Sequence, residues 1–304
     1  MTETPQIGPP ESARLTADAA PVTGSTGPDL VISARQVTRR YRRPRRSLTR
    51  PGPVVDALRG VDLDVAYGQR LGIVGESGSG KSTLIRLLAG LDRPTSGSIS
   101  FAGRDITRLP DRSLKFLRRD LQMVFQDPMS SLDPRMTVRD IVSEPLVALG
   151  HPNLKARVAE LLDAVGLPAA AANRYPHQFS GGQRQRISIA RALSPHPKVL
   201  VADEPVSALD VSVRAQILNL LMDLVDDFSL TLVFVSHDLS VVRHLCDTVV
   251  VMHEGEIVER GPTTAIYERP THPYTQALLA AAPTLRQALA AHAADRDRKE
   301  PQHR

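Results

Sequence analysis

Eight consecutive residues, 75–82, have the types and spacing of a loop that binds phosphate groups. Their sequence, Gly-Glu-Ser-Gly-Ser-Gly-Lys-Ser, fits the pattern G-x-x-x-x-G-K-[ST]. The apolar run at 71–74 before it predicts a short buried strand, and the apolar spacing at 83–89 predicts a helix. A loop between such elements surrounds an anion with backbone N–H groups and the positive end of the helix dipole. The segment therefore predicts a nucleotide-phosphate site.

Two side chains of this loop have specific expected roles. Lys81 would reach the β- and γ-phosphates of a nucleotide, and the Ser82 hydroxyl would bind Mg²⁺. The glycines let the backbone approach phosphates more closely than any Cβ permits. A chance Gly/Ser-rich loop would fit the bare pattern too, but the flanking strand and helix argue against it. The expected nucleotide-binding residues of the loop are Gly75, Glu76, Ser77, Gly78, Ser79, Gly80, Lys81, Ser82 and Thr83.

The composition is that of a globular protein of a reducing compartment. The chain has 304 residues, of which 41% are hydrophobic and 23% charged, and one cysteine, Cys246. The first residues lack a basic stretch followed by an apolar core, so we expect no secretory signal. No apolar run approaches the ~18 residues that a membrane-spanning helix needs. These features indicate a cytoplasmic protein.

The net charge of +5 comes from one short basic segment of the chain. Subtracting seven clustered arginines from it leaves −2. Prolines 44, 51 and 53 lie in or beside the cluster, so we expect a solvated loop; contact with a membrane surface or a partner is the alternative. The cluster consists of Arg39, Arg40, Arg42, Arg43, Arg45, Arg46 and Arg50.

The remaining chain divides by pattern. Residues 1–29 are rich in Pro, Thr, Ala and Gly, which predicts a disordered tail. Strand-like segments at 30–33, 61–65 and 97–103 predict an antiparallel sheet. Between 127 and 178 the pattern is helical, with helices expected at 138–149 and 154–165 and breaks at Pro145, Pro152 and Pro168. Continuous apolar runs at 199–202, 232–235 and 248–252 predict parallel strands covered on both faces. A helical tail follows residue 262.

Two acids end the first of these buried strands. An Asp at position 203 can hold Mg²⁺, and Glu204 beside it can polarise an attacking water. Taken alone, the pair is equally compatible with a helix-capping turn.

A second anion-binding helix start is predicted at 180–183, where the sequence is Ser-Gly-Gly-Gln. In isolation it could be an ordinary turn. One nucleotide does not need two such cradles from one chain, so the segment points to a second chain.

The phosphate loop, the Ser-Gly-Gly-Gln segment and the strand ending in Asp203 and Glu204, in that order, closely resemble the ATPase subunits of ABC transporters. The resemblance implies an α/β P-loop NTPase fold with a mixed central sheet, an antiparallel β subdomain and a helical subdomain. The ATPase domain would cover 30–262, with the helical subdomain at about 127–185. A C-terminal extension with a frayed end would cover 263–304.

The same resemblance implies roles for further residues. Tyr41 would stack on adenine, and Asp210 lies in the loop that crosses the dimer interface. Glu204, His237 and Gln126 would be catalytic, while Ser82, Gln126 and Asp203 would hold Mg²⁺. Ser180, Gly181, Gly182 and Gln183 form the signature that would act on the partner's ATP. Phe179 stands where the family commonly has leucine, a conservative change.

The segment at 269–278, Arg-Pro-Thr-His-Pro-Tyr-Thr-Gln-Ala-Leu, resembles the C-terminal extension of peptide and nickel importer ATPases. The insertion at 41–55 and the segments at 125–136 and 174–179 resemble the second ATPase subunit of dipeptide and oligopeptide permeases. This implies ATP hydrolysis that drives peptide uptake, or uptake of nickel or another small solute. The implied partners are a second ATPase subunit, in a heterodimer or a homodimer, two membrane permease subunits and, indirectly, an extracytoplasmic solute-binding protein. The chain would then lie peripherally on the cytoplasmic face of the membrane.

Two other functions fit the sequence less well than a role in import. A soluble ABC ATPase acting on ribosomes or DNA usually carries two cassettes or a long coiled coil, which this sequence lacks, so we expect no nucleic acid. A silent regulatory subunit would have a replaced Glu204 or a broken signature, and both are intact. Some sister subunits hold an iron–sulfur cluster with cysteines in the tail. The only cysteine here is Cys246, so we expect none.

Overall fold

The computed structural model describes residues 29–42 and 54–281. The predicted disordered tail, apart from Asp29, the end of the extension from 282 onward and the segment 43–53 lie outside this part of the chain.

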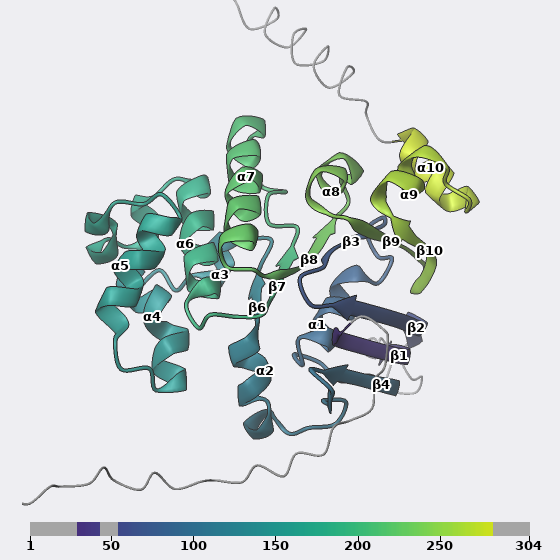
Figure 1. Cartoon of the computed structure of the whole chain (residues 1–304), viewed down its shortest axis with the longest axis horizontal. Helices are drawn as coiled ribbons and strands as arrows, with labels where there is room; N and C mark the ends of the chain where they lie inside the picture. Colours follow the sequence, from purple (N-terminus) through teal and green to yellow (C-terminus); the bar gives the residue numbers. More distant parts are fainter. Residues whose placement is uncertain (1–28, 43–53, 282–304) are drawn as a thin grey trace, which may run out of the picture.

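The centre of the molecule is a six-stranded sheet with the order β10-β9-β3-β8-β7-β6. The first five of these strands in sequence are parallel to one another, and β10 is antiparallel to β9 (Figure 1). The buried apolar runs form these strands, as predicted, because helices cover both faces. The short β6 was not predicted, since Gln122 interrupts its apolar run. The bounds are β3 (Arg70–Val74), β6 (Leu121–Val124), β7 (Val199–Asp203), β8 (Thr231–Ser236), β9 (Thr248–His253) and β10 (Glu256–Pro262).

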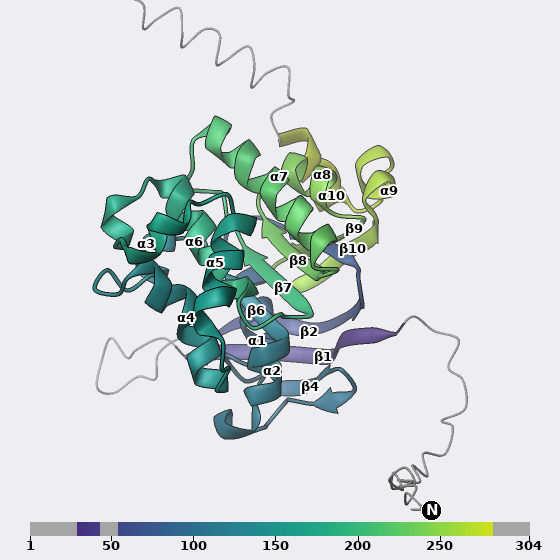
Figure 2. The same cartoon turned by 60° about the vertical axis from the view of Figure 1, so that its left-hand side comes forward.

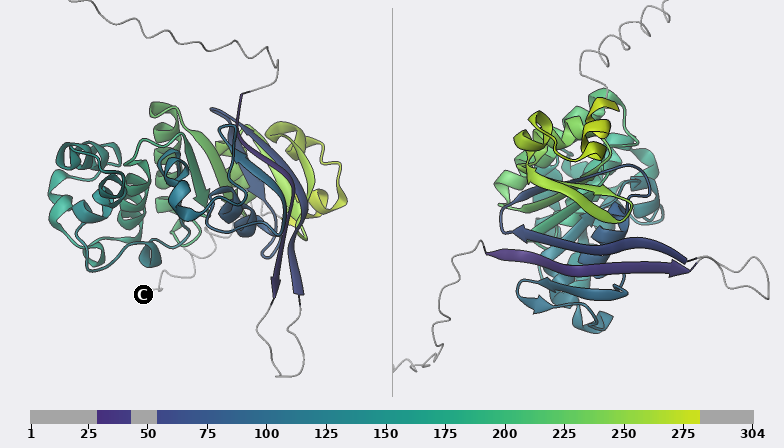
Figure 3. Two further views of the ribbon diagram at one scale, coloured as in Figure 1. Left: turned by 90° about the horizontal axis from the view of Figure 1, so that it is seen from below. Right: turned by 90° about the vertical axis from the view of Figure 1, so that its right-hand side faces the viewer.

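A second, antiparallel sheet has the order β2-β1-β4-β5. Its strands β1 and β2 form a long ribbon along one side of the molecule (Figure 3). The helix α1 (Lys81–Leu88) packs between the two sheets, and apolar side chains of all three form one continuous core. The bounds are β1 (Leu30–Arg42), β2 (Val54–Ala66), β4 (Ser96–Phe101) and β5 (Arg104–Asp105).

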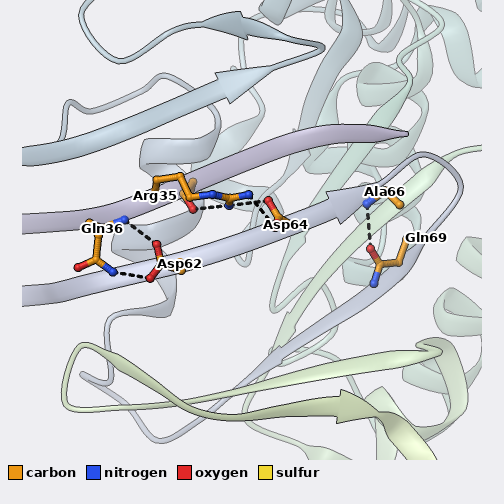
Figure 4. A network of polar contacts seen from close by, with 7 residues as sticks. Arg35, Gln36, Asp62, Asp64, Ala66 and Gln69 are labelled. Atoms are coloured by element: carbon orange, nitrogen blue, oxygen red, sulfur yellow. Dashed lines mark hydrogen bonds and ion pairs between the residues drawn. The ribbon is translucent and has the colours of Figure 1, made fainter. Parts of the chain in front are cut away.

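Polar pairs fasten β1 to β2 on the exposed face of this ribbon (Figure 4). Arg35 donates to Asp64 through both terminal nitrogens, at 2.6 and 2.9 Å. At a register shift in β1, the backbone N–H of Gln36 lacks its regular place in the strand pairing. It donates instead to the Asp62 carboxylate at 2.8 Å.

The expectation of a solvated loop for the arginine cluster is wrong for its first three members. Arg39, Arg40 and Arg42 belong to β1. Arg39 pairs with Asp92 at 2.8 Å, and Arg40 with Asp56 at 2.6 Å. Asp56 belongs to the neighbouring strand β2, and Asp92 lies in the loop between α1 and β4, so the composition of the arginine cluster alone could not show these pairings.

The helical region extends from one edge of the central sheet (Figures 1 and 2). The predicted break at Pro145 is wrong, because α4 continues through it to Leu149. A proline inside a helix removes one hydrogen bond, but Ile141, Val142 and Leu146 are buried around it and hold the helix in place. The helix begins with a capping box between Thr137 and Asp140. The bounds are α3 (Pro128–Ser131), α4 (Val138–Leu149), α5 (Leu154–Ala164) and α6 (Gly181–Leu193).

The other helices lie against the two sheets and the C-terminal strands. They are α2 (Lys115–Asp120), α7 (Val211–Asp227), α8 (Leu239–Leu245), α9 (Thr263–Glu268) and α10 (Pro273–Ala281). The last two form the start of the C-terminal extension. Within 29–42 and 54–281, no helix combines the length and the apolar character that crossing a membrane requires.

Candidate functional site

The phosphate loop joins β3 to α1, as predicted, and its glycines are needed where it turns. Gly80, directly before α1, has φ 104°, and a Cβ there would lie 2.6 Å from the carbonyl oxygen of Ala57. At Gly75, φ is 153° and a Cβ would lie 2.2 Å from the Met252 carbonyl oxygen. Side chains are excluded at both positions because other strands press against the loop.

Lys81 is buried beneath this loop, with 6% of its surface exposed. Its Nζ donates to the carbonyl oxygens of Gly75 at 2.7 Å and Glu76 at 2.8 Å. Burial lowers the pKa of the ammonium, and the nearby carboxylates of Glu204 and Asp203 partly oppose this shift. Ser82 is exposed at the first turn of α1. The loop thus holds one buried positive charge and one accessible hydroxyl.

Asp203 and Glu204 follow one another at the end of β7. Burial, together with the neighbouring Glu204 charge, raises the pKa of Asp203 to about 6, while Lys81 acts in the opposite direction. Glu204 has a positive φ of 45°, and its backbone N–H donates to the Val235 carbonyl of β8 at 3.0 Å. A non-glycine residue held in this conformation by its surroundings is typical of a functional turn.

Three predicted catalytic residues, far apart in the sequence, meet at Glu204. The Oε2 atom of Glu204 accepts a hydrogen bond from Nε2 of Gln126 at 3.2 Å. It also lies 3.2 Å from Nδ1 of His237. The cause is the sheet order, since β6, β7 and β8 are adjacent and parallel and each ends just before one of these residues. The Glu204 side chain is 18% exposed and that of His237 60%, so the cluster opens to solvent on the histidine side.

Known proteins resemble this chain in sequence and in overall fold. Residues 58–207 match the family described as ABC transporter, and residues 258–303 match the oligopeptide/dipeptide transporter C-terminal region. The chain is 49% identical over 260 residues to the Di/tripeptide transport ATP-binding protein DppF of Pseudomonas aeruginosa, with 84% of this chain and 80% of the relative covered. The chain belongs to the ABC transporter ATP-binding family. It is an ABC ATPase.

Two further similarities bear on this ABC ATPase. It is 51% identical over 257 residues to the Oligopeptide transport ATP-binding protein OppD of Mycobacterium tuberculosis, but spans only 42% of that relative's length. The solved dimeric structure of the ATP-binding cassette MJ0796 in a post-hydrolysis state, bound to ADP and Pi, has a TM-score of 0.68 at 32% identity. It covers 76% of this chain and 98% of that one. The predicted fold class is confirmed.

The signature segment starts α6, in the helical region and on the other side of the central strands from α1 (Figure 1). Ser180 and Gln183 form a reciprocal capping box, in which the Gln183 N–H donates to the Ser180 hydroxyl and the Ser180 N–H to the Gln183 amide oxygen. Gly182 is buried, and a Cβ there would lie 2.4 Å from Cγ1 of Val213 in α7. Gly181 is exposed, like Ser180 and Gln183. Gly182 is thus required by packing within the chain itself.

The predicted dimer loop, residues 207–210, ends at Asp210, directly before α7. The Ser207 hydroxyl donates to the Glu204 carbonyl at 3.1 Å, so the loop is tied to the turn at Glu204. Sequence reasoning missed Arg214, one turn into α7. Its guanidinium lies 3.7 Å from the Asp238 carboxylate, directly after His237. An arginine four residues after Asp210 in a helical pattern was the available signal.

Tyr41 lies on β1, apart from the Glu204 cluster in sequence and in sheet. Its hydroxyl donates to Asp92 at 2.8 Å, and the guanidinium of Arg39 lies 4.6 Å from its ring centroid. The ring is therefore held in a fixed orientation with a cation over it.

Proposed function

We propose that this ABC ATPase hydrolyses ATP to drive the import of di- or oligopeptides through membrane permease subunits. The meeting of Gln126, Glu204 and His237 beside the phosphate loop carries the hydrolytic part of this proposal. The peptide part is supported by the match of residues 258–303 to the oligopeptide/dipeptide transporter C-terminal region and by the similarity to DppF, a di/tripeptide transport ATP-binding protein. Nickel or another small solute is the alternative cargo.

Each residue of the cluster has chemistry suited to one task. Glu204 would take the proton of a water that attacks the γ-phosphate, with Gln126 orienting the carboxylate through its amide N–H. His237 would contact the γ-phosphate from the exposed side. Lys81 would exchange its carbonyl partners for the β- and γ-phosphates, a stronger charge-assisted contact. Tyr41 would hold the adenine.

The oxygen-rich set of Ser82, Asp203 and Gln126 fits Mg²⁺, a hard cation that prefers oxygen ligands. Burial and the Glu204 charge raise the pKa of Asp203 more than Lys81 lowers it, so a bound cation would further favour the ionised carboxylate. When bound, Mg²⁺ would neutralise charge that develops on the phosphates. Asp203 would then stay ionised, and the Gln126 amide would keep one end for Glu204 and the other for the cation.

We further propose that the functional unit contains a second ATPase subunit, with a heterodimer favoured over a homodimer. The exposed signature residues Ser180, Gly181 and Gln183 lie on α6, separate from α1 and the phosphate loop of the same chain. They would complete the nucleotide site of the partner, while Asp210 would lie at the interface between the subunits.

A groove beside Gln126 supports a membrane partner at the cytoplasmic face. It has a volume of about 480 Å³ and lies between α2, α4, β6 and the end of α1. Leu91, Phe125 and Leu149 line it, although they are 52%, 38% and 38% exposed. Exposed apolar side chains around a hollow are typical of a protein–protein contact. A permease segment bound there would touch Phe125, the neighbour of Gln126, and so link transport to the catalytic cluster.

The test is reconstitution. The complex is purified from membranes, its partner chains are identified, and uptake of labelled dipeptide into vesicles is measured with and without ATP. ATP-dependent uptake that Lys81→Ala abolishes would support the proposal. Partner chains of permease type with uptake of nickel instead of peptide would select the alternative cargo. Stable partners of another class would refute the transport role.

A further inference from the structure

A tyrosine of the C-terminal extension touches the phosphate loop. The hydroxyl oxygen of Tyr274, at the start of α10, accepts a hydrogen bond from the backbone N–H of Glu76 at 3.0 Å. The two residues lie 198 positions apart in the sequence. The segment around Tyr274 resembles other C-terminal extensions in sequence, but nothing in that resemblance indicates a contact between this tyrosine and the phosphate loop.

The turn between β9 and β10 holds Tyr274 in this position. The rings of Tyr274 and His253 are stacked, with centroids 3.9 Å apart and planes inclined by 28°. His253 is the last residue of β9, and two residues later the N–H of Gly255 donates to the Ser79 carbonyl at 3.0 Å. The phosphate loop, this turn and α10 therefore form one contact group.

The extension is also anchored away from the loop. The Glu259 carboxylate on β10 accepts the N–H and the hydroxyl of Thr271 at 2.7 and 2.8 Å, and the N–H of His272 at 3.2 Å. These bonds fix the residues directly before α10. The residues before Tyr274 are thus held in place by contacts that do not involve the phosphate loop.

The contact acts on the part of the loop that holds the lysine. While the N–H of Glu76 is bound by Tyr274, its carbonyl accepts from Nζ of Lys81 at 2.8 Å and from the N–H of Ser79 at 3.2 Å. A shift of Tyr274 would therefore be passed through the backbone of Glu76 to the lysine and to the turn at Ser79.

We propose that Tyr274 is a positioning residue of the nucleotide site, which fixes the loop backbone at Glu76 so that the loop is preorganised for phosphates. The C-terminal extension would then be a structural part of the ATP site as well as a mark of the transporter class. This inference rests on the phosphate loop being the ATP site, as the proposed function requires. Its physical basis is that a loop held in the binding conformation loses less entropy when the ligand binds.

The test compares two tyrosines of the extension in the full-length protein. Tyr274→Phe keeps the ring and its stacking on His253 and removes only the hydroxyl. Tyr267→Phe is the matched control, because its hydroxyl donates to the Leu239 carbonyl and not to the loop. ATP affinity is measured by calorimetry, and KM and kcat in the assembled transporter.

We expect ATP binding about threefold to tenfold weaker in Tyr274→Phe, the usual effect of one lost hydrogen bond. The KM for ATP should rise in parallel, and kcat at saturating ATP should stay within about twofold of wild type, since the groups around Glu204 are untouched. The control should keep wild-type affinity. Equally weakened ATP binding in both tyrosine variants would mean that either change merely loosens the extension, and it would contradict the inference.

A second variant covers the case in which Tyr274→Phe does not fold. His253→Leu leaves the hydroxyl in place but removes the ring against which Tyr274 stacks, and we expect it to weaken ATP binding in the same direction. Wild-type affinity in a folded Tyr274→Phe, or in His253→Leu when the former cannot be made, would refute the inference alone. Failure of the wild-type chain to bind ATP would instead refute the proposed function with it.

Discussion

Oε2 of Glu204 lies 3.2 Å from Nδ1 of His237, and this contact joins the ends of two adjacent parallel strands. The same oxygen accepts from Gln126 at 3.2 Å. This carboxylate oxygen is therefore shared by two neighbours from adjacent strand ends. The contact therefore brings the three residues proposed to act in hydrolysis together at one oxygen atom.

Replacing Glu204 by glutamine should preserve ATP binding and remove most hydrolysis. The amide keeps the shape of the side chain but cannot accept a proton, and loss of a general base typically costs about 10²–10⁴ in rate. The measurement is phosphate release by the assembled transporter. Glu256→Gln, an exposed glutamate of β10, is the matched control and should behave as wild type. Turnover above half the wild-type rate in Glu204→Gln would exclude this residue as the base.

Asp203 should make the nucleotide-free, metal-free protein less stable as the pH rises. Its pKa is about 6 in the folded protein against an ordinary value of 3.8, so the folded state binds the proton more tightly. The stabilisation is complete below about pH 4 and is lost as the pH rises through about 6. Asp203→Asn should remove this contribution, which we estimate at about 1–3 kcal/mol.

Urea denaturation with a chelator at several pH values between 4 and 8 would measure it. The free energy of unfolding of wild type, relative to Asp203→Asn, should fall across this range. Parallel curves for the two proteins would mean that Asp203 ionises normally in the fold.

The two signature glycines should respond differently to alanine. A Cβ at Gly182 would meet Val213 at 2.4 Å, so Gly182→Ala should destabilise this chain by about 1–3 kcal/mol through overpacking. A Cβ at Gly181 would lie 3.4 Å from Leu209, an ordinary contact. Gly181→Ala should therefore fold normally and bind ATP at its own loop, yet reduce hydrolysis in the assembled dimer.

Thermal unfolding, ATP affinity and dimer turnover separate the two effects. Loss of ATP binding by isolated, folded Gly181→Ala would show that the signature acts within its own chain. Loss of dimer turnover in Gly182→Ala would not by itself indicate an effect on the partner's site, because the substitution also disturbs the packing of α6 against α7.

An acidic residue in the groove should release the membrane partner. Leu91→Glu places a charge in the apolar groove, whereas Val147→Glu alters an equally exposed apolar residue of α4 outside it. We expect Leu91→Glu to lose about tenfold in permease binding, because it removes an apolar contact and adds a charge that must lose its water when the partner binds, even with Lys115, Arg118 and Arg191 in the same groove. The control should bind normally. Co-purification with the permease subunits, with ATP binding as a check on folding, measures both.

The sequence by itself determined the chemistry that is contiguous in the chain. The loop before α1 with Lys81, the start of α6 after Ser180 and the strand that ends at Asp203 lie where the sequence predicted them, because each is a short motif whose neighbours along the chain fix its conformation. The buried strands were found for the same reason, since their continuous apolar runs reflect burial on both faces.

Only the tertiary structure decided which distant residues meet. The order of β6, β7 and β8 brings Gln126, Glu204 and His237 together, and the packing of α10 brings Tyr274 to Glu76. It also overrode local rules, as where α4 continues through Pro145. Strand order and helix docking depend on the fit of surfaces that are far apart in sequence, and no local spacing encodes that fit.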